Sequence, residues 1–200
     1  MDAQLHDIGR SQFEAVRLSM RHLAQLTGPR SFETLLRRNV VTGATVAFRR
    51  SLLALALPFV NGWLHDEWLA ILAAAQDGLR CVTEPLVLYR QHDSNQCGMR
   101  QEALTEQLSS AITVVRRSGS PRLLALRNRI KTRLPASPQQ QRLTARITQA
   151  LRFEVARESL PTRRIARLPR VLARLLVGSY HREADGLRSA AKDMLAGNKR

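Results

Sequence analysis

Residues 62–76 read Gly-Trp-Leu-His-Asp-Glu-Trp-Leu-Ala-Ile-Leu-Ala-Ala-Ala-Gln. The Asn61-Gly62 pair that opens the stretch is typical of a turn, and the apolar run after Glu67 is long enough for a helix. We predict a helix from Asp66 to Gln76 that is closed by Gly78. A carboxylate suits the start of a helix, because the positive end of the helix dipole lies there. The stretch therefore predicts a largely apolar helix with Asp66 at its N-terminus.

Segments with strand-like composition lie on both sides of this helix. Residues 39–48 are rich in β-branched side chains, and residues 80–83 and 86–89 are two further short runs that a Glu84-Pro85 bend separates. Such runs are typical of strands, and the glycine at position 43 marks a close approach of backbone or ligand. We predict strands in these three segments, with short helices at 31–36 and 50–57.

The second half of the chain is basic and has the pattern of helices. Residues 101–200 carry 21 Lys+Arg against 7 Asp+Glu, whereas residues 1–100 carry 11 against 9. Apolar residues recur there at helical spacing between proline- and glycine-containing breaks. We predict helices at 104–115, 123–134, 143–160, 171–177 and 187–195, with Pro161 and Pro169 interrupting the chain between them.

The order of motifs in the first half resembles a known family. They follow one another as Thr42-Gly43, Pro58, His65-Asp66-x-Trp68, Gly78, Glu84-Pro85-Leu86-x-Leu88-Tyr89-Arg90-x-His92 and Asn95. This order resembles family 2 glycosyltransferases of the GT-A fold, in particular the rhamnosyltransferase-like enzymes of bacterial surface polysaccharide synthesis. The tail, from Gly178-Ser-Tyr180 to Lys192-Asp193, is similar to the tail of those enzymes.

The resemblance implies a fold and a reaction. The fold is an α/β, partial GT-A (nucleotide-diphospho-sugar transferase-like) domain that lacks its N-terminal half. It would occupy residues 1–100, with a basic all-helical extension over residues 101–200. The reaction is transfer of a sugar from a nucleotide-sugar donor to a surface-polysaccharide or lipid-linked acceptor.

In such enzymes the aspartate of this motif is the general base, a role that falls on Asp66. The acceptor hydroxyl must lose its proton as it attacks the anomeric carbon, and a carboxylate at the acceptor pocket can take that proton. The alternative is structural, because an aspartate directly before a helix that begins at Glu67 is a good N-cap. The two interpretations stay open at this point.

Four neighbouring residues are candidates for acceptor or donor binding. Thr42 and Gly43 would line the cleft, with the glycine letting substrate approach the backbone. His65 would contact the acceptor or orient Asp66. Trp68 would stack on a sugar ring, although a tryptophan on an apolar helix is more often part of a core. For Thr42 and Gly43 the alternative is an irregularity within a strand.

A second candidate group follows the last predicted strand. By resemblance, His92 would ligate the divalent metal, Mg or Mn, and Arg90 would bind the donor phosphates. An ion pair within a surface loop, between this group and Asp93 or Glu84, is the alternative.

The chain departs from the family in one respect. It contains no Asp-x-Asp motif, which in the family holds the metal and the nucleotide sugar. We therefore expect a truncated or split enzyme, with a complementary N-terminal chain as one candidate partner, and no sugar transfer by this chain alone.

Two non-catalytic functions compete with the transferase. The formal net charge of +16 favours an anionic partner, either nucleic acid or anionic lipid. Nucleic acid is the weaker candidate, because the basic half offers only Phe153 and Tyr180 for base stacking. The run from Arg163 to Leu176 alternates basic and apolar residues, including Arg164, Arg167, Arg170 and Arg174, as an interfacial membrane helix does.

Composition also indicates a location. The N-terminus is polar and acidic, no apolar run approaches the length of a membrane span, and the two cysteines are not at the short spacing of a zinc site. We expect a cytoplasmic protein, with a peripheral position on the inner face of the membrane as the alternative.

Overall fold

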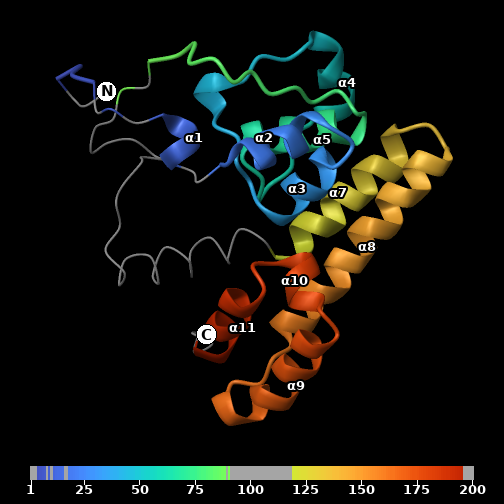
Figure 1. Ribbon diagram of the computed structural model, residues 1–200. Coiled ribbons are helices and arrows are strands. Elements are labelled where there is room, and N and C mark those ends of the chain that lie inside the picture. Colours follow the sequence, from blue (N-terminus) through green and yellow to red (C-terminus); the bar gives the residue numbers. More distant parts are fainter. Residues whose placement is uncertain are drawn as a thin grey trace. The chain divides into compact units, whose positions relative to one another are not determined.

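A computed structural model describes residues 4–7, 9, 11–15, 18–88, 90 and 119–195 (Figure 1). Within them the chain forms two compact units, which are described separately. The first contains the helices between Gln12 and Ala75, and the second contains those between Ser120 and Leu195. The expected boundary between residues 100 and 101 lies outside the described residues.

The first unit is a small cluster of helices. Its elements are α1 (Gln12–Ala15), α2 (Met20–Thr27), α3 (Ser31–Arg37), the 3-10 turns η1 (Gly43–Thr45) and η2 (Arg50–Leu52), α4 (Leu53–Ala56) and α5 (His65–Ala75). Helix α2 begins with a capping box between Ser19 and His22. Helix α5 is apolar on nearly all sides and is buried along most of its length, with α3 and α4 packed against it. The predicted helix at 66–76 is confirmed, with its start and its end each one residue earlier.

The expected α/β fold is wrong. The described residues contain no β-strand, and residues 39–48 form extended chain around η1. Residues 80–88 belong to no helix or strand, and Leu86 and Leu88 are exposed. A strand is stable only when a neighbour satisfies its backbone N–H and C=O groups, and β-branched composition alone supplies no neighbour. These segments are therefore extended but unpaired among the described residues.

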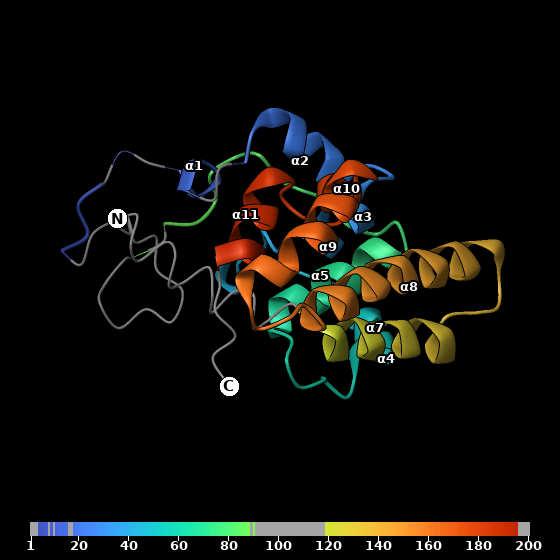
Figure 2. The ribbon, with the colours of Figure 1, turned by 90° about the horizontal axis from the view of Figure 1, so that it is seen from below.

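The described part of the second unit is helical, as the sequence predicts. The predicted helix at 104–115 lies outside the described residues. The unit contains α7 (Ser120–Arg133), α8 (Pro138–Glu158), α9 (Arg164–Leu176), α10 (Ser179–Glu183) and α11 (Leu187–Leu195). Helices α7 and α8 lie side by side as a hairpin (Figures 1 and 2), and Leu126, Ile130 and Ile147 on these two helices are fully buried. At the other end of α8, Phe153, Val171 and Tyr180 form a core with Leu160 and Ala190.

Helix α9 differs from its prediction. It begins at Arg164 and continues through Pro169, which was expected to interrupt it. Proline removes one helical hydrogen bond, but the flanking turns are held by the buried side chains of Arg167 and Val171. Helix α9 is therefore anchored on both sides of the proline.

No described helix combines the length and the apolar composition needed to cross a bilayer.

Candidate active site

The candidate site lies where η1 meets the start of α5. The turn η1 is closed by Thr45, whose backbone N–H and hydroxyl both donate to the carbonyl of Thr42 at 2.9 Å. Helix α5 begins at His65, and its first backbone bond runs from Trp68 N to Leu64 O at 2.9 Å. The two elements place Thr42 and Gly43 beside the first turn of the helix.

Gly43 lies against two of the predicted site residues. A Cβ built on Gly43 would lie 2.9 Å from Nε2 of His65 and 3.4 Å from Oδ2 of Asp66. The first distance is shorter than a Cβ tolerates, so the imidazole occupies the space that a side chain would need. The glycine therefore permits the close approach of η1 to the His65-Asp66 pair, for a reason of space rather than of backbone conformation.

The two carboxylate oxygens of Asp66 have different surroundings. Asp66 is buried, and its Oδ1 accepts a hydrogen bond from the backbone N–H of Glu67 at 2.8 Å. Its Oδ2 faces Gly43 and accepts no hydrogen bond from the described residues. The N-cap is Leu64, so Asp66 lies within the first turn rather than at the cap. One oxygen thus stabilises the start of the helix, and the other is available as a proton acceptor.

Trp68 and His65 face different surroundings. The Trp68 side chain is fully buried, and its Nε1–H donates to the carbonyl of Ala56 at 2.9 Å. The ring of Trp63 packs on it at a centroid distance of 5.4 Å and a tilt of 56°. Trp68 therefore has no free ring face for a sugar in this structure. His65 is exposed, so it can contact a ligand.

Of the phosphate and metal candidates, the structure describes only Arg90. Arg90 is exposed and follows an extended stretch, and the contacts that define the site do not include it. His92, the predicted metal ligand, lies outside the described residues. Among the residues that the structure describes, no group of three or more His, Cys, Asp or Glu side chains could hold a metal ion.

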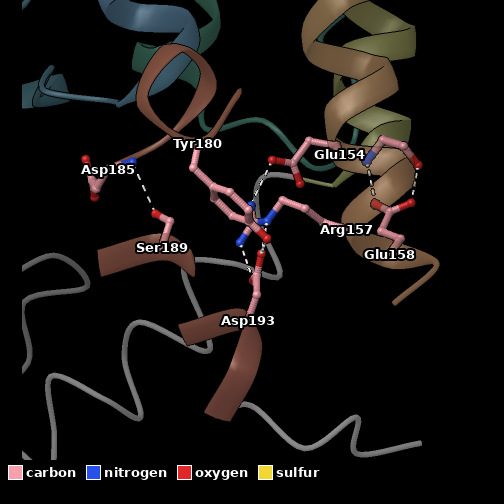
Figure 3. A network of polar contacts seen from close by, with 8 residues as sticks. Glu154, Arg157, Glu158, Tyr180, Asp185, Ser189 and Asp193 are labelled. Atoms are coloured by element: carbon pink, nitrogen blue, oxygen red, sulfur yellow. Dashed lines mark hydrogen bonds and ion pairs between the residues drawn. The ribbon is translucent and has the colours of Figure 1, made fainter. Parts of the chain in front are cut away.

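The helical unit contains a second polar cluster, which the sequence analysis did not predict (Figure 3). Asp193 of α11 accepts two hydrogen bonds from Arg157 of α8, at 2.7 and 2.8 Å, and one from the Tyr180 hydroxyl of α10 at 2.7 Å. Arg157 also pairs with Glu154 at 3.0 Å and lies over the ring of Phe153. The only signal was the tail motif itself, which contains both Tyr180 and Asp193.

The surroundings of this cluster shift its ionisation in ways that suit a structural role. Burial raises the pKa of the Tyr180 hydroxyl, and the hydrogen bond to Asp193 raises it further. The pKa of Arg157 is also raised, because its hydrogen bonds and ion pairs with Asp193 and Glu154 outweigh burial, the largest single effect. Tyr180 thus stays neutral and Arg157 charged. Both Asp193 oxygens are engaged within the protein, which leaves none for a substrate.

A further polar contact joins α7 and α8 at the open end of their hairpin. The carboxylate of Glu158 accepts from the backbone N–H and the hydroxyl of Ser120, each at 2.7 Å. This arrangement satisfies free N–H groups at the start of α7 and fixes the open end of the hairpin.

No protein-family model, curated protein or solved structure matches the chain significantly.

Proposed function

We propose that the first unit forms the acceptor-binding and proton-accepting part of a sugar transferase. The observation that carries the proposal is the free Oδ2 of the buried Asp66, which faces Gly43 beside His65. A general base needs an oxygen that the protein leaves unoccupied, within reach of the reacting hydroxyl. The transferase motifs of the sequence support the same assignment, because Thr42, Gly43, His65 and Asp66 belong to them.

The reaction would be a single displacement at the anomeric carbon, in which this chain supplies the proton acceptor. The acceptor hydroxyl oxygen forms a bond to the anomeric carbon, and the bond from that carbon to the nucleoside diphosphate breaks. The electron pair leaves with the diphosphate, and the hydroxyl proton passes to Oδ2 of Asp66. His65 would hold the acceptor, and Gly43 would leave room for it.

Donor binding is assigned to a complementary chain or domain. In this proposal that partner supplies the Asp-x-Asp carboxylates, the nucleotide pocket and the divalent Mg or Mn. Exposed apolar side chains in extended segments of the first unit, Phe48, Val82, Leu86 and Leu88, offer a surface for it. Arg90, at the end of the same stretch, would reach the donor phosphates.

The test separates acceptor binding from transfer. Saturation-transfer NMR of the purified chain with oligosaccharide fragments of bacterial surface polysaccharides should detect binding, and the chain alone should release no nucleotide from sugar nucleotides. Joined to the donor-binding half of a family 2 glycosyltransferase, the chain should transfer sugar. Asp66→Asn should then reduce turnover by roughly 10² to 10⁴, the range of general-base catalysis, and keep acceptor binding.

The matched control is Glu67→Gln, which removes the neighbouring carboxylate and keeps Asp66. It should retain turnover. If the joined enzyme is active and Asp66→Asn keeps its turnover, the base lies elsewhere. If the chain binds no glycan, the acceptor site is not in this unit.

A further inference from the structure

Helix α9 presents an apolar stripe to solvent. The stripe consists of Ile165, Leu168, Leu172 and Leu176, which recur at the three- and four-residue spacing of one helix face. Ile165 and Leu176 are 87% and 86% exposed, and Leu168 and Leu172 are each 45% exposed. Four large aliphatic side chains in a row on one helix are a candidate interaction surface rather than scattered apolar residues. We call them the α9 stripe.

The opposite face of α9 fixes this orientation. Arg167 is buried, and it donates from Nε to the carbonyl of Pro161 at 2.5 Å and from Nη1 to the carbonyl of Asp193 at 2.7 Å. Val171 packs in the core with Phe153 and Tyr180. Rotating α9 to bury the stripe would break these contacts and leave a buried guanidinium without acceptors. The stripe therefore faces away from the core of this unit.

The charged residues of α9 are all of one sign, because the helix contains no Asp or Glu. Arg164, four residues before Leu168, lies beside the stripe on the helix surface. Arg170, two residues from both Leu168 and Leu172, lies on another side of the helix. Arg163 precedes the helix, and Arg174 lies in its last turn. Arg163, Arg164 and Arg170 are exposed. The sequence assigned Arg167 to the same interfacial set, but its burial removes it from that set.

We propose that the α9 stripe binds the surface of an anionic lipid bilayer. The four aliphatic side chains would enter the boundary between headgroups and acyl chains, as in interfacial helices. Arginine stems are long and apolar, so their guanidinium groups can reach lipid phosphates while the stems lie along the membrane. The inference stands on the second unit alone and does not depend on the proposed transferase.

Charge and surface chemistry favour this occupant over two others. A second copy of the chain would place one arginine-rich helix against another, and like charges oppose that contact. A nucleic acid would satisfy the arginines but would leave the aliphatic side chains unused, and this unit offers few aromatic rings for bases. An anionic bilayer accepts both the stripe and the arginines.

The experiment is co-sedimentation of the whole chain with vesicles. Phosphatidylglycerol-containing vesicles should bind the chain at low salt, and pure phosphatidylcholine vesicles should bind it much more weakly. Ile165→Ser/Leu176→Ser should weaken binding about a hundredfold, because each aliphatic side chain contributes about tenfold. Arg163→Gln/Arg164→Gln, which neutralises the two exposed arginines next to Ile165, should weaken it about thirtyfold, and about 1 M salt should have a similar effect.

Matched controls use exposed residues of the hairpin. Leu124→Ser/Val155→Ser removes two exposed aliphatic side chains from α7 and α8, and Arg133→Gln/Arg142→Gln removes two exposed arginines from the same helices. Both should bind vesicles as the wild type does. Circular dichroism should show that all variants are folded, because every substituted side chain points to solvent.

Three results would overturn the proposal. The first is no sedimentation with phosphatidylglycerol vesicles at low salt. The second is equal binding of the wild type and of both α9 variants. The third is that the chain binds another partner and does not bind vesicles. In that case a single-stranded RNA bound through the arginines, or a dimer that Ile165→Ser/Leu176→Ser dissociates in ultracentrifugation, would be the occupant.

Discussion

The guanidinium of Arg157 donates two parallel hydrogen bonds to the carboxylate of Asp193, from Nε to Oδ2 at 2.7 Å and from Nη2 to Oδ1 at 2.8 Å. The two residues lie on α8 and α11, and both side chains are about nine-tenths buried. Bidentate geometry of this kind fixes both distance and orientation. The contact also places the backbone carbonyl of Asp193 where Arg167 of α9 can donate to it. One ion pair thus links three helices.

Asp193→Asn should destabilise the helical unit by about 3 kcal/mol. The amide would turn an N–H group toward the donors of Arg157, and a buried charge that loses its partner costs about 3–5 kcal/mol. Urea unfolding followed by circular dichroism measures the loss. Asp185→Asn, which removes an exposed carboxylate from the same region, should cost less than about 1 kcal/mol. Equal losses in the two variants would show that the bidentate pair does not stabilise the unit.

Glu154 predicts a pH dependence of the opposite sign to that of an ordinary ion-paired carboxylate. Burial raises its pKa above the usual 4.5, and the attraction of Arg157 only partly opposes this. Between the unfolded and the raised folded pKa, the folded state binds more protons, so the free energy of unfolding falls as pH rises through that window. Glu154→Gln should remove this fall and keep an acceptor for Arg157. Unfolding at a series of pH values above 4.5 checks it, and an unchanged slope would contradict it.

Substitution of Trp68 tests whether this side chain is part of the core or binds a ligand. Trp68→Phe removes the hydrogen bond to the Ala56 carbonyl and leaves a small cavity, so it should cost about 2–3 kcal/mol. Acceptor binding by the folded variant should be unchanged, because the ring has no free face. Trp63→Phe, on a partly exposed ring, should cost less. A folded Trp68→Phe chain that loses acceptor binding would restore the stacking role.

Helical periodicity predicted helices that the structure contains, whereas β-branched composition predicted strands that the described residues do not form. A helix such as α5 satisfies its backbone N–H and C=O groups within its own segment. The helices at 66–76 and 187–195 could therefore be located from local sequence. A strand depends on a neighbouring strand, and the segments at 39–48 and 80–88 have none among the described residues. The prediction of a GT-A domain therefore went wrong where it required a sheet.

The candidate site likewise has features that local sequence could indicate and features that it could not. Asp66 and His65 became candidates through the resemblance of their motif, and Gly43 through the same resemblance and its position within a β-branched run. Local sequence could not show that Trp68 turns inward to the Ala56 carbonyl. Nor could it show that Arg167 is buried rather than available to lipid, because its acceptor, the Asp193 carbonyl, is far away in sequence.

Gly43 gives a test of the site that requires no knowledge of the substrate. The Cβ of Gly43→Ala would lie 2.9 Å from Nε2 of His65, so one of them must move. The imidazole is exposed and can rotate, whereas the Asp66 carboxylate is held by Glu67 N. We therefore expect a stability loss of no more than about 1 kcal/mol, together with a displaced imidazole. NMR should show shifted ring resonances of His65.

The displaced ring should also lower acceptor binding, because it would enter the space where the hydroxyl meets Oδ2 of Asp66. Ala44→Ser, at the neighbouring exposed position, is the control and should change neither the ring resonances nor binding. In a His65→Ala background, Gly43→Ala should no longer cost stability, because the nearest clashing atom is gone. If Gly43→Ala leaves the His65 resonances in place, η1 does not contact the start of α5 in solution. The site would then lack the contact on which the assignment of Asp66 depends.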